Sequence, residues 1–372
     1  MHGVLVVDKP EGVTSFDVVA RARRALGVRR IGHAGTLDPL ATGVLVLCVG
    51  EATKLVPYLM DADKEYRATA CLGVTTDTDD AAPGSRVVAR APAGALRALD
   101  RESVAAAFAA QVGLVRQRPP AFSALKVDGE RLYDRARRAR DQADAELEAE
   151  VASQAAAKER PVRIDAITLD ALRLCPELSD AEAEAGAAAL PAVTFTVRCG
   201  KGTYIRSLAR DVGEQLGVGA HLTALRRLRV GAFTVERAVP LAELVAGRVG
   251  AAQLAGLAAA IAHLPVLHVD AEAARRLREA LRAELAALSD RLEEARARAP
   301  AAPVAVIDPQ GRLVAVLERA PRGESAPSSG PSSGPSSWQI GRGFNPDPGA
   351  DSGADGEPAP ASADQPEQPA AT

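Results

Sequence analysis

Short apolar runs of strand length, separated by stretches with helical spacing, constrain the fold of this chain more than any other feature. Residues 4–7 are followed by a Lys-Pro-Glu-Gly turn, and residues 44–49 follow a glycine-rich loop. Apolar runs of this length between turn signals predict β-strands. Between them, apolar residues recur at helical spacing after Ser15 and stop at Gly27. We therefore expect a helix capped by Ser15, and a fold that combines strands with helices.

The same mixture continues through the first two thirds of the chain. Residues 66–74 and 193–199 are predicted strands, the second because apolar residues alternate along it. Residues 103–112 and 205–216 have helical spacing, and a glycine follows each of them. Residues 29–42 are expected to form a loop. Strands and helices are thus interspersed along the sequence.

The last third of the chain has a different character. Residues 271–297 predict one long helix of Ala, Leu, Arg and Glu, and residues 304–316 predict a strand, a turn and a second strand. Residues 325–337 repeat a Ser-Ser-Gly-Pro unit that is typical of flexible linkers, and residues 347–372 have the composition of disordered segments. The only Trp lies between them, in residues 338–344. We expect that segment to return as a strand.

Two acidic stretches interrupt the pattern, at residues 141–157 and 176–189. They are rich in Ala, Glu and Asp, which permits helices. They show no apolar stripe that could pack on a core. We expect both to be exposed surface insertions.

The formal net charge of −3 conceals a basic body. Residues 345–372 hold six acidic residues and no basic ones, residues 141–157 hold five and none, and the rest of the chain carries +8. Arginines cluster within residues 21–30, 131–140 and 226–229. One such cluster is often only a solvated helix face. Three together favour contact with the phosphates of a nucleic acid.

Several classes of protein do not fit this sequence. At 372 residues the chain exceeds one hydrophobic core, so two domains are expected. No apolar run approaches the roughly 20 residues of a membrane span, and the N-terminus lacks the features of a secretory signal. We expect a cytoplasmic protein with no membrane role, and nothing suggests more than a monomer. The four Cys and five His lack the spacing of disulfide frameworks or metal sites, so no metal is expected.

One carboxylate lies in an unusual context. Asp38 falls in the string GHAGTLDPLATG at residues 32–43, directly before a predicted buried strand. An Asp before Pro is usually a turn residue, but a rigid strand can hold a functional carboxylate in place. The string resembles the catalytic motif of the TruB family of bacterial tRNA pseudouridine-55 synthases. Four further strings resemble that family in order and spacing: VDKPEGVTSFDVV (7–19), DKEYRATACLGVTTDTDD (63–80), QRPPAFSALKVDGERLYDRAR (117–137) and VRCGKGTYIRSLARDVGEQLGVGAHLTALRRLRVGAF (197–233).

The resemblance implies an α+β fold. Residues 1–240 would form the pseudouridine synthase catalytic domain, with a mixed, mainly antiparallel sheet flanked by helices. Residues 241–346 would contain a linker helix and a small, β-rich, PUA-like RNA-binding domain, interrupted by a flexible loop at residues 322–337. Residues 347–372 would be a disordered acidic tail.

The resemblance also implies a reaction, the isomerisation of uridine 55 in the T loop of tRNA to pseudouridine without a cofactor. The uracil is detached at N1, turned, and rejoined to the ribose through C5. Asp38 would be the nucleophile, attacking the sugar or adding to the base. Arg206, in the string GTYIR, would be the partner that keeps Asp38 an anion. A cation at a helix start opposes the helix dipole, and a carboxylate partner would offset that penalty.

Other residues take roles by the same resemblance. Tyr66 would stack on the uracil and take part in proton transfer at C5, and Leu225 would line the uracil pocket. His33 would fill the gap that the extruded uridine leaves in the T-loop stack. The remaining substrate contacts are expected from Lys64, Lys201 and Arg227, the last two to RNA phosphates, which position a substrate without reading its sequence.

Other functions are compatible with parts of this pattern. A non-catalytic RNA-binding protein would keep the arginine clusters, but it would not need Asp38, Tyr66 and Arg206 together. A glycosidase would need a second carboxylate, and no comparable motif supplies one. A synthase guided by small RNAs is a closer rival, against which the single-chain layout argues. Residues 200–203 lack the early glycine of a phosphate loop, so nucleotide binding is rejected.

Overall fold

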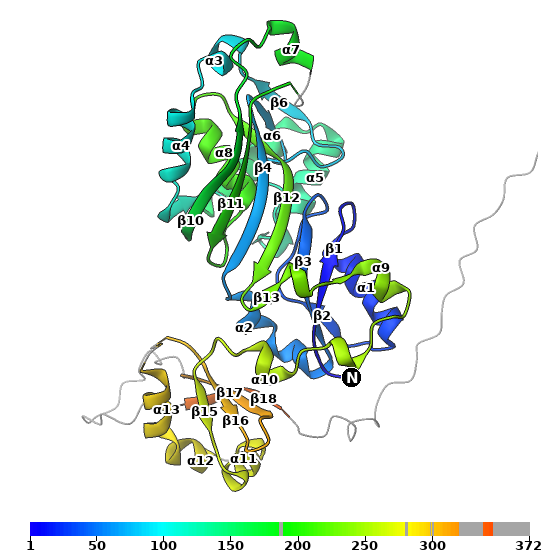
Figure 1. Ribbon diagram of the computed structural model, residues 1–372, viewed down its shortest axis with the longest axis vertical. Coiled ribbons are helices and arrows are strands. Elements are labelled where there is room, and N and C mark those ends of the chain that lie inside the picture. The colour runs from blue at the N-terminus through cyan, green and yellow to red at the C-terminus, as the bar shows by residue number, and fades with distance from the viewer. Residues whose placement is uncertain (186–188, 280–281, 298, 300, 320–337, 345–372) are drawn as a thin grey trace, which may run out of the picture.

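Two separate sheets form the framework of the protein. The computed structural model describes residues 1–185, 189–279, 282–297, 299, 301–319 and 338–344. In Figure 1 the large sheet fills the upper part of the molecule and a four-stranded sheet lies below it. The predicted flexible loop at residues 322–337 and the predicted disordered tail at residues 347–372 lie outside the described residues.

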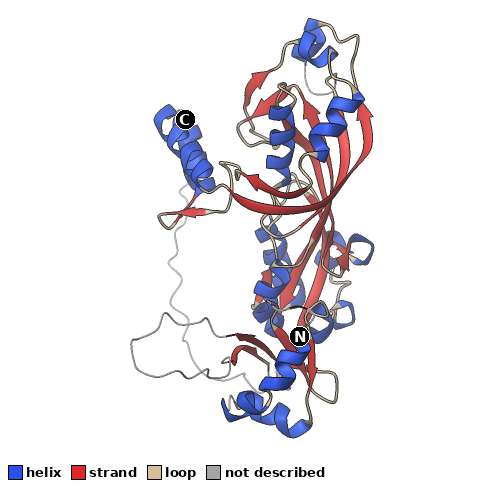
Figure 2. Ribbon diagram, turned by 90° about the vertical axis from the view of Figure 1, so that its left-hand side faces the viewer, coloured by secondary structure: helices blue, strands red, loops and turns tan. Residues whose placement is uncertain are grey.

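The large sheet has ten strands. They are β1 (Gly3–Lys9), β2 (Ile31–His33), β3 (Thr42–Val49), β4 (Lys64–Leu72), β7 (Gly113–Gln117), β10 (Arg160–Arg173), β11 (Ala192–Cys199), β12 (Ala220–Val230), β13 (Phe233–Thr234) and β14 (Val239–Pro240). The order is β14-β1-β3-β12-β4-β11-β10-β7, with β2 beside β3 and β13 beside β12. Only β1–β14 and β12–β3 are parallel pairs. The sheet is therefore mixed and mainly antiparallel, and Figure 2 shows its long strands as one continuous layer.

Burial explains which strands the sequence revealed. Every residue of β3 after Thr42 is buried, which accounts for its uninterrupted apolar run. In β11 the buried residues Val193, Phe195 and Val197 alternate with partly exposed ones. Strand β12 shows no such pattern, because its polar residues His221 and Arg227 are buried as well, and it was not predicted. Strand β2 lies within residues 29–42, so the prediction of an unbroken loop there was wrong.

Helices flank the large sheet and pack with its strands in two apolar cores. Those before the small sheet are α1 (Ser15–Leu26), η1 (Gly50–Leu55), α2 (Val56–Met60), α3 (Ala93–Arg97), α4 (Arg101–Ala109), α5 (Leu132–Gln142), α6 (Ala145–Ala157), α7 (Asp180–Ala185), α8 (Ile205–Gln215), η2 (Val235–Arg237) and α9 (Leu241–Val245). Helices α4 and α8 share an apolar core with β4, β11 and β12. Helices α1 and α9 share another with β1 and β3. Two short hairpins complete this part: β5 (Val74–Thr76) with β6 (Val87–Arg90), and β8 (Lys126–Val127) with β9 (Glu130–Arg131).

The start of α1 differs from the prediction in a way that matters for the site. Thr14, not Ser15, is the N-cap, and its side chain exchanges hydrogen bonds with Asp17 in a capping box. Ser15 is buried, and its hydroxyl donates to the carbonyl of Leu37 at 3.0 Å and accepts from the Leu37 amide at 2.8 Å. The helix thereby anchors the loop that precedes Asp38.

The acidic stretches are not merely exposed insertions. Val151 and Ala155 of α6 are buried, in one apolar cluster with Phe122 and Leu132. Two apolar residues one helical turn apart are enough to seat α6 on α5. In the second stretch, Leu178 and Ala183 join the main core. Most described residues of both stretches are exposed as predicted, and only the expectation that neither packs on a core was wrong. Residues 186–188 lie outside the described part of the chain.

The small sheet follows a connecting segment that contains η3 (Ala251–Gln253) and α10 (Leu257–Ala260). Its strands are β15 (Val266–His268), β16 (Val304–Ile307), β17 (Leu313–Arg319) and β18 (Trp338–Gly343), in that order. The predicted returning strand with the single Trp is confirmed as β18, antiparallel to β17. The predicted long helix was wrong, because it is replaced by α11 (Ala271–Arg278), α12 (Arg282–Ala287) and α13 (Ser289–Arg296). The breaks let leucines from all three helices reach one small core.

A shared apolar cluster joins the two sheets. Ile261, Val316 and Phe344 pack in it together with residues of β1 and β3. The Tyr58 hydroxyl in α2 donates to Glu318 Oε1 of β17 at 2.6 Å. Helix α2 therefore touches the small sheet, while its C-terminal end reaches the candidate site.

Candidate active site

The loop that carries Asp38 is fixed by a buried lysine. Lys9, at the end of β1, is fully buried, and its ammonium donates to the carbonyls of Pro10, Val13 and Pro39 at 3.0, 2.7 and 3.3 Å. Burial lowers the pKa of Lys9 to about 8, although the Asp38 carboxylate opposes that shift. Carbonyl oxygens on three sides satisfy the ammonium and tie together the backbone around Asp38.

Arg227 holds the same loop from the sheet. It is 1% exposed, and its guanidinium donates to the carbonyls of Val44 at 2.7 Å and Gly35 at 2.9 Å. Residue 227 pairs with Gly43 where β12 meets β3. The predicted contact between Arg227 and an RNA phosphate does not fit this position, because the side chain is buried and engaged with the loop. Its role here is to shape the loop.

Asp38 and Arg206 form an ion pair, as the resemblance to the TruB family predicts. Arg206 Nε lies 3.0 Å from Asp38 Oδ2 and 3.8 Å from Asp80 Oδ2. Its other nitrogens donate to the carbonyls of Thr78 at 2.8 Å and Phe122 at 3.0 Å. Burial disfavours the charged guanidinium, but nearby carboxylates, first Asp38 and then Asp80, outweigh it and raise the pKa of Arg206. The second residue of α8 is thus a permanent cation aimed at the carboxylate.

The ion pair opens onto a cavity of about 570 Å³. The Asp38 side chain remains 39% exposed, whereas that of Arg206 is 5% exposed, so a ligand in the cavity can reach the carboxylate. The lining comes from the loop that carries Asp38, the end of α2, the start of β4, residues 123–124, the start of β10, the segment before α8 with its first turn, and β12. It consists of Gly35, Thr36, Leu37, Asp38, Met60, Asp61, Lys64, Ser123, Ala124, Arg160, Pro161, Lys201, Gly202, Thr203, Tyr204, Ile205, Arg206 and Leu225.

Three of the predicted substrate contacts line this cavity. Leu225 supplies an apolar wall. Lys64 is 7% exposed, and burial lowers its pKa. Lys201 lies at the rim, where its ammonium binds both carboxylate oxygens of Asp61 at 2.9 and 3.0 Å. That pair is exposed, and such pairs exchange partners at little cost.

The structure does not bring two of the predicted site residues, Tyr66 and His33, into the cavity lining. Tyr66 of β4 is directly opposite Arg227 of β12 in the sheet register and is 9% exposed. Burial raises the pKa of the Tyr66 hydroxyl, and the Arg227 guanidinium opposes that shift. His33 ends β2, and burial lowers its pKa, so its imidazole is neutral at physiological pH. Neither residue is part of the cavity lining.

Other residues of the site were missed by sequence reasoning. Asp80 is the second carboxylate beside Arg206 and is 3% exposed. Tyr204 lines the cavity, with the Arg160 guanidinium 5.5 Å from the centre of its ring. Ser123 also lines the cavity, and its buried hydroxyl has no hydrogen-bond partner among the described residues. These residues stood within the quoted motif strings, but only the packing distinguishes them from their neighbours.

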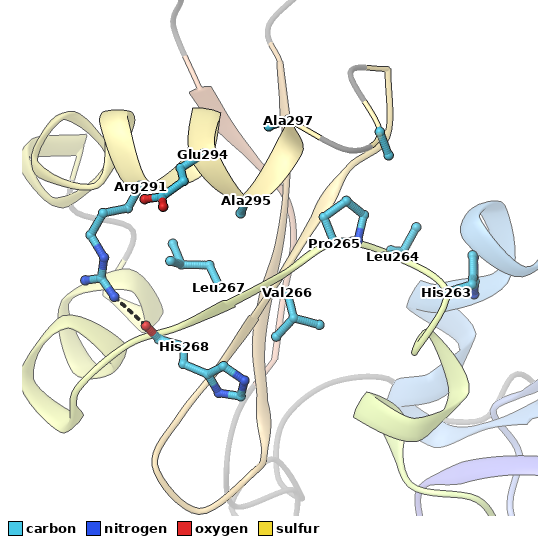
Figure 3. Close-up of a pocket in the computed structure, with 11 residues that line it drawn as sticks. His263, Leu264, Pro265, Val266, Leu267, His268, Arg291, Glu294, Ala295 and Ala297 are labelled. Atoms are coloured by element: carbon cyan, nitrogen blue, oxygen red, sulfur yellow. Dashed lines mark hydrogen bonds between the residues drawn. The ribbon is translucent and has the colours of Figure 1, made fainter.

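Another, larger hollow of the described structure lies away from Asp38. It has a volume of about 790 Å³ and lies beside β15 and α13, where Arg291 donates to the carbonyl of His268 (Figure 3). Its lining mixes apolar residues with His263, His268, Arg291 and Glu294, and Asp38 and Arg206 do not belong to it. Among the described residues no three His, Cys, Asp or Glu side chains are placed to hold a metal ion. No helix in the described part is long and apolar enough to cross a bilayer.

Solved structures share this architecture. The Cbf5-Nop10-Gar1 complex matches with a TM-score of 0.57 and 23% identity, over 85% of this chain and 78% of that chain. The H/ACA RNP bound to a substrate RNA containing 2′-deoxyuridine matches with a TM-score of 0.58 and 21% identity, over 92% and 85%. These likenesses concern the fold, and a matching family model gives the class, that of the pseudouridine synthases.

Sequence comparison narrows the class to a family. The model of the TruB family pseudouridylate synthase N-terminal domain matches residues 23–205, and that of the tRNA pseudouridylate synthase B C-terminal domain matches residues 206–257. The tRNA pseudouridine synthase B of Thermobifida fusca is 42% identical over 325 residues, 87% of this chain and 97% of the relative. That of Burkholderia pseudomallei is 43% identical over 333 residues, 88% and 96%. The chain belongs to the TruB family.

Proposed function

We propose that this protein isomerises uridine 55 in the T loop of tRNA to pseudouridine. The observation that carries the proposal is the partly exposed Asp38 carboxylate, held 3.0 Å from the buried Arg206 guanidinium at the wall of the cavity. A carboxylate that is open to a cavity and paired with a buried guanidinium suits nucleophilic chemistry that needs no cofactor. The relatives named tRNA pseudouridine synthase B supply the substrate class.

The reaction exchanges one bond to the ribose for another. The N1–C1′ bond breaks, the C5–C1′ bond forms, the C5 hydrogen leaves as a proton, and N1 gains a proton. Asp38 is the proposed nucleophile, toward either the sugar or the base. Arg206 holds the Asp38 carboxylate in place and stabilises its charge.

The remaining residues would position the uridine. A stacked uridine cannot reach Asp38, so it must be extruded from the T loop. His33 would fill the vacated stack, a role that suits the neutral imidazole produced by burial. Leu225 and Tyr66 would contact the uracil, with Tyr66 also taking part in proton transfer at C5. Lys64 would contact the substrate from the cavity lining. Lys201 would bind the RNA backbone by exchanging Asp61 for a phosphate.

The proposal extends to the whole molecule. Residues 1–240 would be the catalytic domain, and the small sheet within residues 241–346 a PUA-like RNA-binding domain. The enzyme would act as a monomer on the T arm in the cytoplasm.

The test is release of tritium from an unmodified tRNA transcript labelled at uridine C5. Wild-type protein should release tritium, since the C5 hydrogen leaves when the new bond forms. Asp38→Asn should reduce the rate by roughly 10³-fold or more, because the amide is a poor nucleophile. Asp100→Asn is the matched control, because this exposed N-cap lies outside the cavity lining and Asn caps equally well.

Each negative result has a separate meaning. No release by the wild type would contradict the enzymatic proposal, and tRNA binding without release would favour an RNA-binding protein. Release that persists in Asp38→Asn would contradict the assignment of the nucleophile. Pseudouridine mapped to a position outside the T loop would contradict the choice of uridine 55.

A further inference from the structure

The side chain of Gln117 makes two hydrogen bonds to the backbone of a single residue in the wall of the active-site cavity. Its Nε2 donates to the carbonyl of Tyr204 at 3.0 Å, and its Oε1 accepts from the amide of Tyr204 at 2.8 Å. Gln117 is 2% exposed and ends strand β7. The Gln117 side-chain amide therefore makes the same pair of hydrogen bonds with the Tyr204 backbone that a residue of a neighbouring strand would make.

Tyr204 needs such a partner because of its place in the chain. It is the N-cap of α8, its backbone is extended with φ −101° and ψ 116°, and no side chain caps the helix there. Arg206, the partner of Asp38, is the second residue of that helix. A shift of the Tyr204 peptide would therefore move the Tyr204 ring in the cavity wall and the Arg206 guanidinium together.

The segment after Gln117 stays bound to the first turns of α8. The carbonyl of Arg118 accepts from Ser207 Oγ at 2.8 Å and from Arg210 Nη2 at 2.7 Å. The carbonyl of Phe122 accepts from Arg206 Nη2 at 3.0 Å. Gln117 is the first residue of this segment that contacts the start of α8, through Tyr204. It is also paired in register with Arg160 of β10. The edge of the large sheet thereby sets the position of the α8 N-terminus.

We propose that Gln117 is a positioning residue for the isomerisation, fixing Tyr204 in the cavity wall and Arg206 against Asp38. The inference rests on the proposed function. Glutamine suits the position because its amide carries one donor and one acceptor at the right reach. Glutamate would lose the donor and set a carboxylate against the Tyr204 carbonyl. Leucine would remove both bonds, so that the Tyr204 amide would lose its partner and the Tyr204 carbonyl would keep only the bond from the Leu208 amide at 3.1 Å.

The experiment compares Gln117→Leu and Gln117→Glu with a matched control, Gln111→Leu. Gln111 also contacts α8, through Gln215 at 3.5 Å, but at the exposed far end of the helix. The measurements are kcat and KM for tritium release from C5-labelled tRNA, together with the thermal midpoint. Both Gln117 variants should lose roughly 10- to 100-fold in kcat, as expected for a misplaced catalytic group, with KM changed less than about threefold. Gln111→Leu should match the wild type in both constants.

The outcomes separate this inference from the proposed function. If the wild type releases no tritium, the proposed function fails, and the role of Gln117 fails with it. If the wild type is active and the folded Gln117 variants keep its kcat, only the positioning role is overturned, even where the thermal midpoint falls. If the leucine and glutamate variants do not fold, Gln117→Asn decides. Its shorter amide cannot hold both groups of Tyr204, so an unchanged kcat would overturn the inference.

Discussion

Three buried cations surround the loop that carries Asp38. Lys9, Arg206 and Arg227 are 0%, 4% and 1% exposed. Buried charges are costly unless they are paired or hydrogen-bonded. Here their hydrogen bonds go to backbone carbonyls, and Arg206 also forms an ion pair with Asp38. The cations therefore stabilise an irregular loop backbone that has few partners of its own, and they hold the proposed nucleophile in a fixed position.

Lys9 gives this arrangement a measurable pH dependence. Its folded-state pKa, about 8, lies below the ordinary value of 10.5. Between those values the unfolded chain binds more protons than the folded one, so the free energy of unfolding rises with pH in that window. Relative to Lys9→Met, the wild type should gain up to about 3 kcal/mol between pH 8 and pH 10.5. Denaturant unfolding of both proteins across this range is the measurement.

The difference between the two proteins removes the contribution of every other titrating group. Lys126→Met, at an exposed lysine, should follow the wild type at each pH. A constant gap between wild type and Lys9→Met from pH 8 to pH 10.5 would contradict the lowered pKa.

At the scale of elements, the site depends on the point where β12 meets β3. The two strands pair in parallel at only two positions, residue 226 with Thr42 and Arg227 with Gly43. Gly43 has a φ of +97°, and a Cβ there would lie 2.2 Å from the Arg227 carbonyl oxygen. No other residue allows this approach. Gly43 thus allows the loop that carries Asp38 to lie close to Arg227.

Gly43→Ala should therefore lower the free energy of unfolding by far more than the positive φ alone would account for. Gly27→Ala is the matched control, because Gly27 ends α1 with a φ of +65° and its Cβ would meet nothing within 4 Å. The control should lose about 1–2 kcal/mol of unfolding free energy. Gly43→Ala should lose at least about 2 kcal/mol more through the clash, and should also lose tritium-release activity. Denaturant midpoints of the two variants test this, and equal losses would show that the strands can separate without cost.

At the scale of the whole molecule, the two sheets share one apolar cluster and should unfold together. Trp338 is the only tryptophan and lies in the small sheet, so its fluorescence reports on that sheet alone. Circular dichroism reports mainly on the large sheet and the helices that pack against it. In the wild type both signals should show the same thermal midpoint, as in a cooperative transition. Separate midpoints would mean that the cluster does not couple the sheets.

Phe344→Ala should uncouple the two signals. Phe344 is 2% exposed within the cluster, and such a truncation typically costs about 3–5 kcal/mol. The Trp338 transition should then come first. Phe16→Ala, at a side chain that is 68% exposed, should leave both transitions coincident.

The sequence by itself determined the elements whose residues show which face is buried. The full burial of β3 and the alternation in β11 appear directly as apolar patterns, because each strand contacts its surroundings residue by residue. The family and its Asp38 motif could be identified from the sequence for a similar reason, since the loop that carries Asp38 is continuous in the chain. The predicted partner Arg206 was found through the motif that contains it.

Tertiary structure decided whatever depends on segments that are distant in the chain. The charge of Arg227 suggested RNA, whereas its burial against loop carbonyls assigns it to the scaffold. Gln117 stood in a quoted motif string, but no sequence pattern linked it to Tyr204, which comes close to it only in the folded structure. The helices α11, α12 and α13 replace one long helix because a small core must receive leucines from each of them. Local periodicity records that a side chain is buried, and only the assembled fold determines which atoms it meets.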